Sequence, residues 1–167
     1  ITMFFMLGNE SRHSHAADEA KLLFNGPGKK VIGFMPNGTL LTYVNALETF
    51  FLYDLSKTAN SGPEWKSQGK LVSGTLSPDG TTVALVFEVG RDKSKIQLCD
   101  STTGVPLKQD FEPTDVGYVA FSNDGKKLAG VCPMNGTVRI WDVSTGGLLD
   151  SMSWAEPMQV VWSGIEF

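Results

Sequence analysis

An apolar run that leads into a tight turn recurs along this chain at a nearly constant interval, and this repeat restricts the fold more than any other feature. Three copies run into a turn containing Asn-Gly or Asp-Gly, and a fourth begins at 161–167. The last apolar residues of the four copies are 42, 45 and 46 residues apart: Phe34, Leu76, Phe121 and Phe167. Internal repeats of 20–50 residues are typical of solenoids and propellers, so the repeat has to be explained before any single motif.

A second pattern recurs at nearly the same interval. Apolar runs end in Asp54, Asp100 and Asp142, which lie 46 and 42 residues apart. A third run, rich in β-branched and apolar residues, lies between the two anchors of each copy, at 40–44, 83–87 and 128–132. Short runs of this composition, bounded by Gly, Asn and Asp, are typical of β-strands.

The turns support tight antiparallel hairpins. Asn-Gly and Asp-Gly supply the positive φ that such turns require. Asn37-Gly38, Asp79-Gly80 and Asp124-Gly125 would close the first hairpin of each copy, and Asn135-Gly136 the second hairpin of the last copy. In the middle copy the second turn is predicted to be longer and charged, at 90–94.

With a fourth, fainter strand in each copy, the period of about 40–45 residues and the Trp141-Asp142 ending resemble the WD40 repeats of a β-propeller. The clearest copy has Phe-Ser-Asn-Asp-Gly at 121–125, Thr-Val-Arg-Ile-Trp-Asp at 137–142 and Ser-Thr-Gly at 144–146. The resemblance covers residues 24–167. The Gly-His pair of the family is absent, and Tyr53 and Cys99 stand at the positions of Trp141.

The resemblance implies an all-β fold of four-stranded antiparallel blades, with about three complete blades and partial blades at both ends. The expected domain is 1–167, with blade-like repeats at 25–69, 70–114 and 115–156 and partial blades at 1–24 and 157–167. The expected strands, from the inner to the outer position of a blade, are 31–34, 72–76, 117–121 and 161–167; then 39–44, 82–87 and 127–132; then 2–7, 49–54, 95–100 and 137–142; then 20–24, 65–70, 105–109 and 148–153.

Propellers close with 4–8 blades, so this count predicts a piece of a larger ring of seven blades. Its end blades would expose apolar faces, and we expect self-association or a complementary chain that completes the ring. A four-bladed ring closed by pairing 1–24 with 157–167 is the alternative.

Charge and composition exclude several classes of partner. The 14 basic and 18 acidic residues give a net charge of −4, and the lysine pairs 29–30 and 126–127 have no aromatic neighbours, so nucleic acid is not an expected partner. No run approaches the roughly 18 apolar residues of a membrane span, and no secretion signal is found. Cys99 and Cys132 are predicted to be buried reduced thiols, which favours an intracellular, cytoplasmic protein, with the nucleus as the alternative.

No catalytic motif is present, so the chain is not expected to be an enzyme, and no cofactor, metal or catalytic residue is assigned. His13 and His15, with Asp18 as a third ligand, could hold a metal ion, but a solvated loop is the preferred interpretation. Asp54, Asp100 and Asp142 are interpreted as turn-capping residues in different blades. Asn9, Asn37 and Asn135 begin glycosylation sequons, but hairpin chemistry alone explains Asn37 and Asn135, and no secretion signal is found, so glycosylation is not expected.

The predicted function is a protein–protein interaction scaffold, because the resemblance implies a rigid disc that presents loops on two rims. The partner-binding residues are not assigned; the loop 56–69 on one rim and the acidic 110–115 on the other are the candidates. Phe51 is expected to pack between blades or at an interface. The alternative is the propeller portion of a larger enzyme, such as a peptidase, that positions its substrate.

Overall fold

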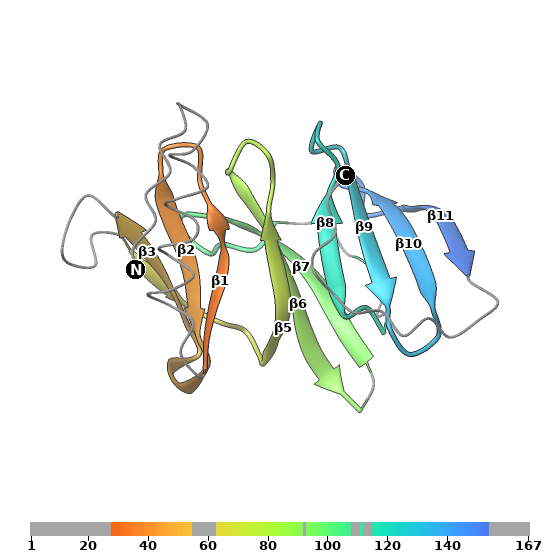
Figure 1. Ribbon diagram of the computed structural model, residues 1–167, viewed down its shortest axis with the longest axis horizontal. Helices are drawn as coiled ribbons and strands as arrows, with labels where there is room; N and C mark the ends of the chain where they lie inside the picture. Colours follow the sequence, from red (N-terminus) through yellow and green to blue (C-terminus); the bar gives the residue numbers. More distant parts are fainter. Residues whose placement is uncertain (1–27, 55–62, 92, 108–110, 112–114, 154–167) are drawn as a thin grey trace, which may run out of the picture.

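The computed structural model describes residues 28–54, 63–91, 93–107, 111 and 115–153, which form three antiparallel β-sheets placed side by side (Figure 1). Within each sheet, neighbouring strands follow one another in the sequence. Blade 1 contains β1 (Lys29–Phe34), β2 (Thr39–Val44), β3 (Thr49–Asp54) and β4 (Glu64–Lys66), with a short 3-10 helix η1 (Asn45–Leu47) before β3. Blade 2 contains β5 (Leu71–Leu76), β6 (Thr82–Gly90) and β7 (Lys93–Asp100). Blade 3 contains β8 (Tyr118–Phe121), β9 (Lys127–Cys132), β10 (Thr137–Asp142) and β11 (Leu148–Ser153).

This arrangement confirms the predicted all-β fold of antiparallel blades. Four strands were expected in each blade, and blades 1 and 3 have four, whereas the described part of blade 2 has three. The predicted inner strands match β1, β5 and β8 to within two residues, and the predicted second and third strands match β2, β3, β9 and β10. The predicted strands 2–7, 20–24 and 161–167 lie outside the described residues. No helix in the described parts of the chain is long and apolar enough to cross a lipid bilayer.

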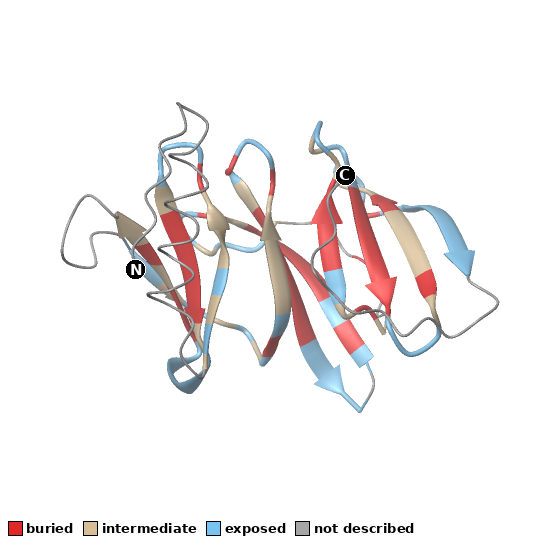
Figure 2. Cartoon of the chain, in the orientation of Figure 1, coloured by how far each residue is buried: buried red, intermediate tan, exposed pale blue. Residues whose placement is uncertain are grey.

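The hydrophobic core lies between the blades, and blade 2 contributes to it from both faces. Successive residues of a strand point to opposite sides of the sheet. On β6, Val83, Leu85 and Phe87 pack towards blade 1, whereas Ala84 and Val86 pack towards blade 3. This explains why 83–87 is apolar throughout: each of its two faces is covered by another sheet (Figure 2).

The repeated third strand obeys the same rule in every blade. Phe50 and Leu52 of β3 pack against blade 2, and Ile96 and Leu98 of β7 occupy the same register and pack against blade 3. Val138 and Ile140 have the equivalent register on β10, so they form the outward face of blade 3. Gln97 and Arg139 lie on the opposite side, as predicted, although Gln97 is buried and donates to the Leu98 and Leu107 carbonyls at 3.1 and 3.2 Å.

Trp141 belongs to the core cluster between blades 2 and 3. Its side chain is 2% exposed and meets the ring of Phe111 edge-on, with 6.1 Å between the ring centroids. Gly130 on the neighbouring strand makes room for it, because a Cβ atom there would lie 2.7 Å from the Trp141 ring. A large aromatic residue and a glycine beside it therefore form one packing unit.

The turn predicted at 90–94 is shorter in the structure than expected. β6 continues to Gly90 and β7 begins at Lys93, with Glu88 paired to Ser94 and Gly90 to Lys93 across a register shift. A bulge allows two strands to stay paired while they twist, and Gly90 adopts a φ of 156° that other residues rarely reach. The result is a hairpin whose strands are longer than their counterparts in blades 1 and 3, and its lower end is exposed in Figure 2.

Two outer strands also differ from the prediction. The strand predicted at 65–70 is β4 (Glu64–Lys66), because the Ser67 hydroxyl bonds the Gly69 backbone and forms a turn there. The strand predicted at 105–109 contributes a single bridge between Pro106 and Cys99 within the described residues. Proline has no N–H to donate, so it interrupts a ladder at this position.

Candidate interaction surfaces

The blades present two rims, which we name after their described charges. The acidic rim consists of the β1–β2, β5–β6 and β8–β9 turns and the turns that follow β7 and β10, at the top of Figure 1. The basic rim consists of the starts of β1 and β5, the end of β4 and the β2–β3 and β6–β7 connections, at the bottom. Loops on a rigid scaffold are the usual place for binding residues.

The carboxylates of the acidic rim are used in its own turns. Asp79 accepts hydrogen bonds from the Ser77 hydroxyl at 2.6 Å and the Thr81 amide at 3.0 Å. Asp124 repeats this with the Ser122 hydroxyl at 2.6 Å and the Lys126 amide at 3.0 Å. These bonds favour the ionised form, so the pKa of each carboxyl lies below its usual value.

The aspartates that end the third strands also accept hydrogen bonds within the turns that follow them. Asp142 accepts from the hydroxyl and amide of Ser144 and from the amide of Thr145, the last at 2.9 Å. Asp100 accepts from the Thr102 and Thr103 amides at 3.1 and 2.7 Å. The interpretation of Asp100 and Asp142 as turn-capping residues is confirmed, and their hydrogen bonds lower the pKa of both carboxyls. The residues that Asp54 would cap lie outside the described residues.

A cavity of about 520 Å³ opens between the β5–β6 and β8–β9 turns. Its lining includes Ser77, Pro78, Asp79, Phe121, Asp124 and Val143. The two carboxylates are already hydrogen-bonded within their turns, so the cavity is a mixed polar and apolar depression rather than a set of free ligands. Among the described residues, no three His, Cys, Asp or Glu side chains are grouped to hold a metal ion.

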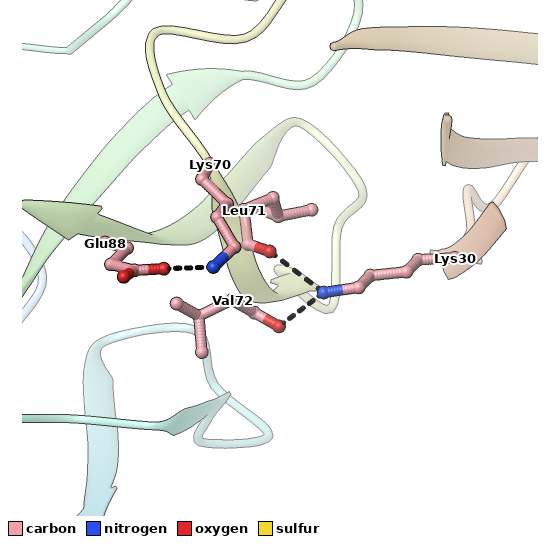
Figure 3. A network of polar contacts seen from close by, with 5 residues as sticks. All are labelled: Lys30, Lys70, Leu71, Val72 and Glu88. Carbon is pink, nitrogen blue, oxygen red and sulfur yellow. Dashed lines mark hydrogen bonds and ion pairs between the residues drawn. The ribbon is translucent and has the colours of Figure 1, made fainter. Parts of the chain in front are cut away.

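Lys30 links two blades at the basic rim (Figure 3). Its ammonium group, on β1, donates to the carbonyls of Leu71 and Val72 on β5 at 2.9 and 2.8 Å. β5 has a register shift between Leu71 and Ser73, and a bulge leaves backbone groups outside the ladder. Partial burial, and the positive charge of Lys70 nearby, lower the pKa of Lys30.

Several predicted site residues lie outside the described residues: His13, His15, Asp18, Asn9, the segment 56–62, Asp110 and Glu112. Asp115 lies at the end of blade 3 that carries the β9–β10 turn, where the Asn135 side-chain amide donates to it at 2.8 Å. Asn37 and Asn135 each accept a backbone amide two residues ahead, from Thr39 and Thr137, as expected for turn residues.

Phe51 lies on the face of blade 1 opposite to Phe50 and Leu52, and is half-buried, with its ring centroid 6.2 Å from that of Tyr53. Cys99 and Cys132 are buried free thiols, as predicted. Burial raises the pKa of Cys99 to about 11 and of Cys132 to about 12, which makes both thiols poor nucleophiles. The sequence analysis did not predict that Lys30 joins two blades or that Gly130 makes room for Trp141. For Gly130 a signal exists, since a glycine in an apolar strand often marks a close approach.

Comparison with known proteins identifies the fold. No protein-family model matches the chain, and no curated protein sequence does. Among solved structures, the Cps50 (Swd1) β-propeller domain of Myceliophteria thermophila matches with a TM-score of 0.58 and 17% identity, over 73% of this chain and 40% of that one. The hydrazine synthase of Kuenenia stuttgartiensis matches with a TM-score of 0.57 and 18% identity, over 71% of this chain and 35% of that one.

This chain thus spans less than half of each structure that it resembles. Such a likeness at low identity, together with three consecutive antiparallel sheets packed face to face, shows that the described part of the chain has a β-propeller fold.

Proposed function

We propose that this chain is a WD40-like propeller segment that works as a protein–protein interaction scaffold without catalysis of its own. The proposal rests on where the buried and the exposed parts of the fold lie. Both core clusters lie between blades and fix the sheets relative to one another, and exposed turns cluster at the two rims. Such a body offers a broad, rigid surface rather than a single deep site, which suits protein partners.

The polar chemistry of the described rims favours binding over catalysis. A general base or nucleophile needs an available partner and a perturbed pKa that suits its task. Asp79, Asp100, Asp124 and Asp142 instead have lowered pKa values and act as acceptors within their own turns. The two cysteines are buried and have raised pKa values.

The test is to immobilise the purified chain, pass cell extract over it and identify proteins that co-elute stoichiometrically by mass spectrometry. The matched variant replaces Asp110, Glu112 and Asp115 with Ser, and a second variant replaces the loop 56–62 with a Gly-Ser linker. A partner that is lost with one variant and kept with the other supports the scaffold. Capture of the same proteins by both variants and by an unrelated propeller contradicts it.

A second candidate is the propeller portion of a larger enzyme. One observation favours it: a structure with this fold is a hydrazine synthase, in which the matched region is 35% of the chain. The sequence on either side of this chain in its gene decides the matter. An adjoining catalytic domain supports the enzyme, and its absence on both sides contradicts it.

A further inference from the structure

The basic rim differs sharply in charge from the rest of this mildly acidic protein. Within the described residues, blades 1 and 2 place seven cations on this rim against two carboxylates, Glu48 and Glu88. A third acid, Asp92, stands between Arg91 and Lys93 in the sequence and lies outside the described residues. The cations are Lys29, Lys30, Lys66, Lys70, Arg91, Lys93 and Lys95. The chain as a whole has a net charge of −4, so this concentration is a local feature and not a reflection of composition.

The strand pairing brings these cations to one end of the two sheets. Lys29 and Lys30 pair with Val44 and Tyr43 at the end of β2, and Lys66 pairs with Thr49 at the start of β3.

In blade 2, Lys93 and Lys95 pair with Gly90 and Phe87 at the end of β6, and the Lys70 carbonyl accepts the Glu88 amide. The extended β6–β7 hairpin carries Arg91, Lys93 and Lys95, and all three are exposed.

Some of these cations form hydrogen bonds or ion pairs within the protein, and others are exposed to solvent. Lys30 bonds the β5 carbonyls, and Lys66 donates to the Leu47 carbonyl and the Thr49 hydroxyl at 3.1 and 2.7 Å. Lys70 pairs with Glu88 at 2.5 Å, so one of the two rim carboxylates is already neutralised (Figure 3). The lowered pKa of Lys30, caused by burial and secondarily by Lys70, is consistent with crowded positive charge at this seam.

Apolar side chains stand among the cations at the two connections. Leu47 of η1 and Val89 of β6 are each 54% exposed. A single exposed aliphatic residue is ordinary, but each of these two has cations beside it. Lys66 donates to the Leu47 carbonyl, and Lys93 and Lys95 lie on the strand paired with the end of β6, so the rim offers apolar as well as charged contacts.

Building on the scaffold function proposed above, we propose that the basic rim of blades 1 and 2 docks an acidic segment of a partner protein in which apolar residues alternate with Asp or Glu. Carboxylates of the partner would pair with Arg91, Lys93 and Lys95 of the exposed β6–β7 hairpin, and its apolar side chains would cover Leu47 and Val89. Charge complementarity speeds encounter and selects partners. The carboxylates Glu48 and Glu88 within the rim, and the lack of an exposed aromatic residue among its members, disfavour a polyphosphate ligand.

The test uses the whole chain and two fluorescein-labelled peptides, one of alternating Glu and Leu and one of alternating Gln and Leu. Binding is followed by fluorescence polarisation. The Glu peptide should bind, and the Gln peptide should bind at least tenfold more weakly. Raising the salt to about 1 M, where the Debye length falls to about 3 Å, should abolish the difference.

Variants locate the site. The triple variant Arg91→Gln, Lys93→Gln and Lys95→Gln should weaken binding of the Glu peptide at least tenfold. The matched control, Lys126→Gln with Lys127→Gln on the acidic rim, should change it less than twofold. All these side chains are exposed, and unchanged circular dichroism and melting temperature will exclude unfolding as the cause.

Three outcomes would overturn the proposal: equal binding of both peptides, equal loss in the control variant, or binding to phosphatidylserine vesicles or single-stranded DNA without binding to the Glu peptide. These outcomes are separable from failure of the scaffold function. A protein partner that co-elutes equally with the triple variant and the native chain rejects the basic rim but keeps the scaffold. Recovery of no specific partner rejects both.

Discussion

Replacing Gly130 with Ala should destabilise the contact between blades 2 and 3. The added Cβ would lie 2.7 and 2.9 Å from two atoms of the Trp141 ring and 3.1 Å from a methyl group of Val116. Trp141 and Val116 are 2% and 1% exposed, so neither side chain has open space into which to move. The indole ring is also too rigid to bend aside.

The size of the effect follows from two opposing terms. Adding one carbon to a well-packed core costs about 1–3 kcal/mol. Replacing glycine by alanine regains about 0.4–1 kcal/mol by reducing the entropy of the unfolded chain. The net loss of unfolding free energy is about 1–2 kcal/mol, which corresponds to a fall in melting temperature of roughly 2–8 °C for a chain of this length.

Urea unfolding followed by circular dichroism and by tryptophan fluorescence measures this loss, and coincident transitions justify a two-state treatment. Gly69→Ala is the matched control, because the nearest atom to a Cβ there is 3.8 Å away, an ordinary contact. Its stability should be unchanged or slightly higher. Gly130→Ala should also cost little in a Trp141→Leu background, since the clash is then removed. Equal stability of Gly130→Ala and the native chain, or an undiminished loss in the Trp141→Leu background, would refute the packing argument.

Four further predictions concern charge, thiols and surfaces. As pH falls below the usual carboxyl pKa of 3.8, the unfolded chain takes up protons before Asp79, Asp100, Asp124 and Asp142 do in the native state, so stability is kept above that pH and lost below it. Melting curves from pH 6 to 2 should show this, and Asp100→Asn with Asp142→Asn should make the acid decline shallower; an identical decline would contradict the role of these bonds. Cys99 and Cys132 should resist iodoacetamide at pH 8.5 in the native chain and react quickly in 6 M guanidinium, and fast native labelling would show that they are accessible. Lys30→Gln should lower the melting temperature more than Lys127→Gln, because only Lys30 joins two blades; equal effects would mean that the bonds to Leu71 and Val72 contribute nothing measurable. Light scattering at increasing concentration should detect self-association through the outward face of blade 3, where Tyr118 and Met152 are 43% and 50% exposed, and a stable monomer of 18.1 kDa would count against it.

Most of the strands and turns could be predicted from residues close together in the sequence. The Asn-Gly and Asp-Gly pairs predicted the hairpin turns, and Gly38, Gly80, Gly125 and Gly136 all have positive φ. Hairpins depend on a few consecutive residues, and two independent anchors at the same interval fixed the register of the copies. The aspartates at the ends of the third strands could be assigned as caps for the same reason, because their partners lie within three residues.

Properties that depend on neighbouring sheets could not be predicted from one strand at a time. The length of the β6–β7 hairpin depends on pairing between Glu88 and Ser94, and a charged stretch of this kind is equally compatible with a loop. The outer strand of blade 2 is reduced to one bridge at Pro106, where a missing N–H outweighs the repeat.

The features of the candidate surfaces also fall into two groups, those predictable from the sequence and those decided by tertiary structure. The sequence determined the repeat, the fold class and the turn-capping role of the aspartates, because each depends on contacts between residues close in the chain. Tertiary structure alone decided that Lys30 reaches carbonyls 41 and 42 residues away, that Gly130 makes room for Trp141, and that lysines from separate strands share one rim. Those features depend on how the sheets stack and twist against one another, and side chains distant in sequence meet only after the blades have packed.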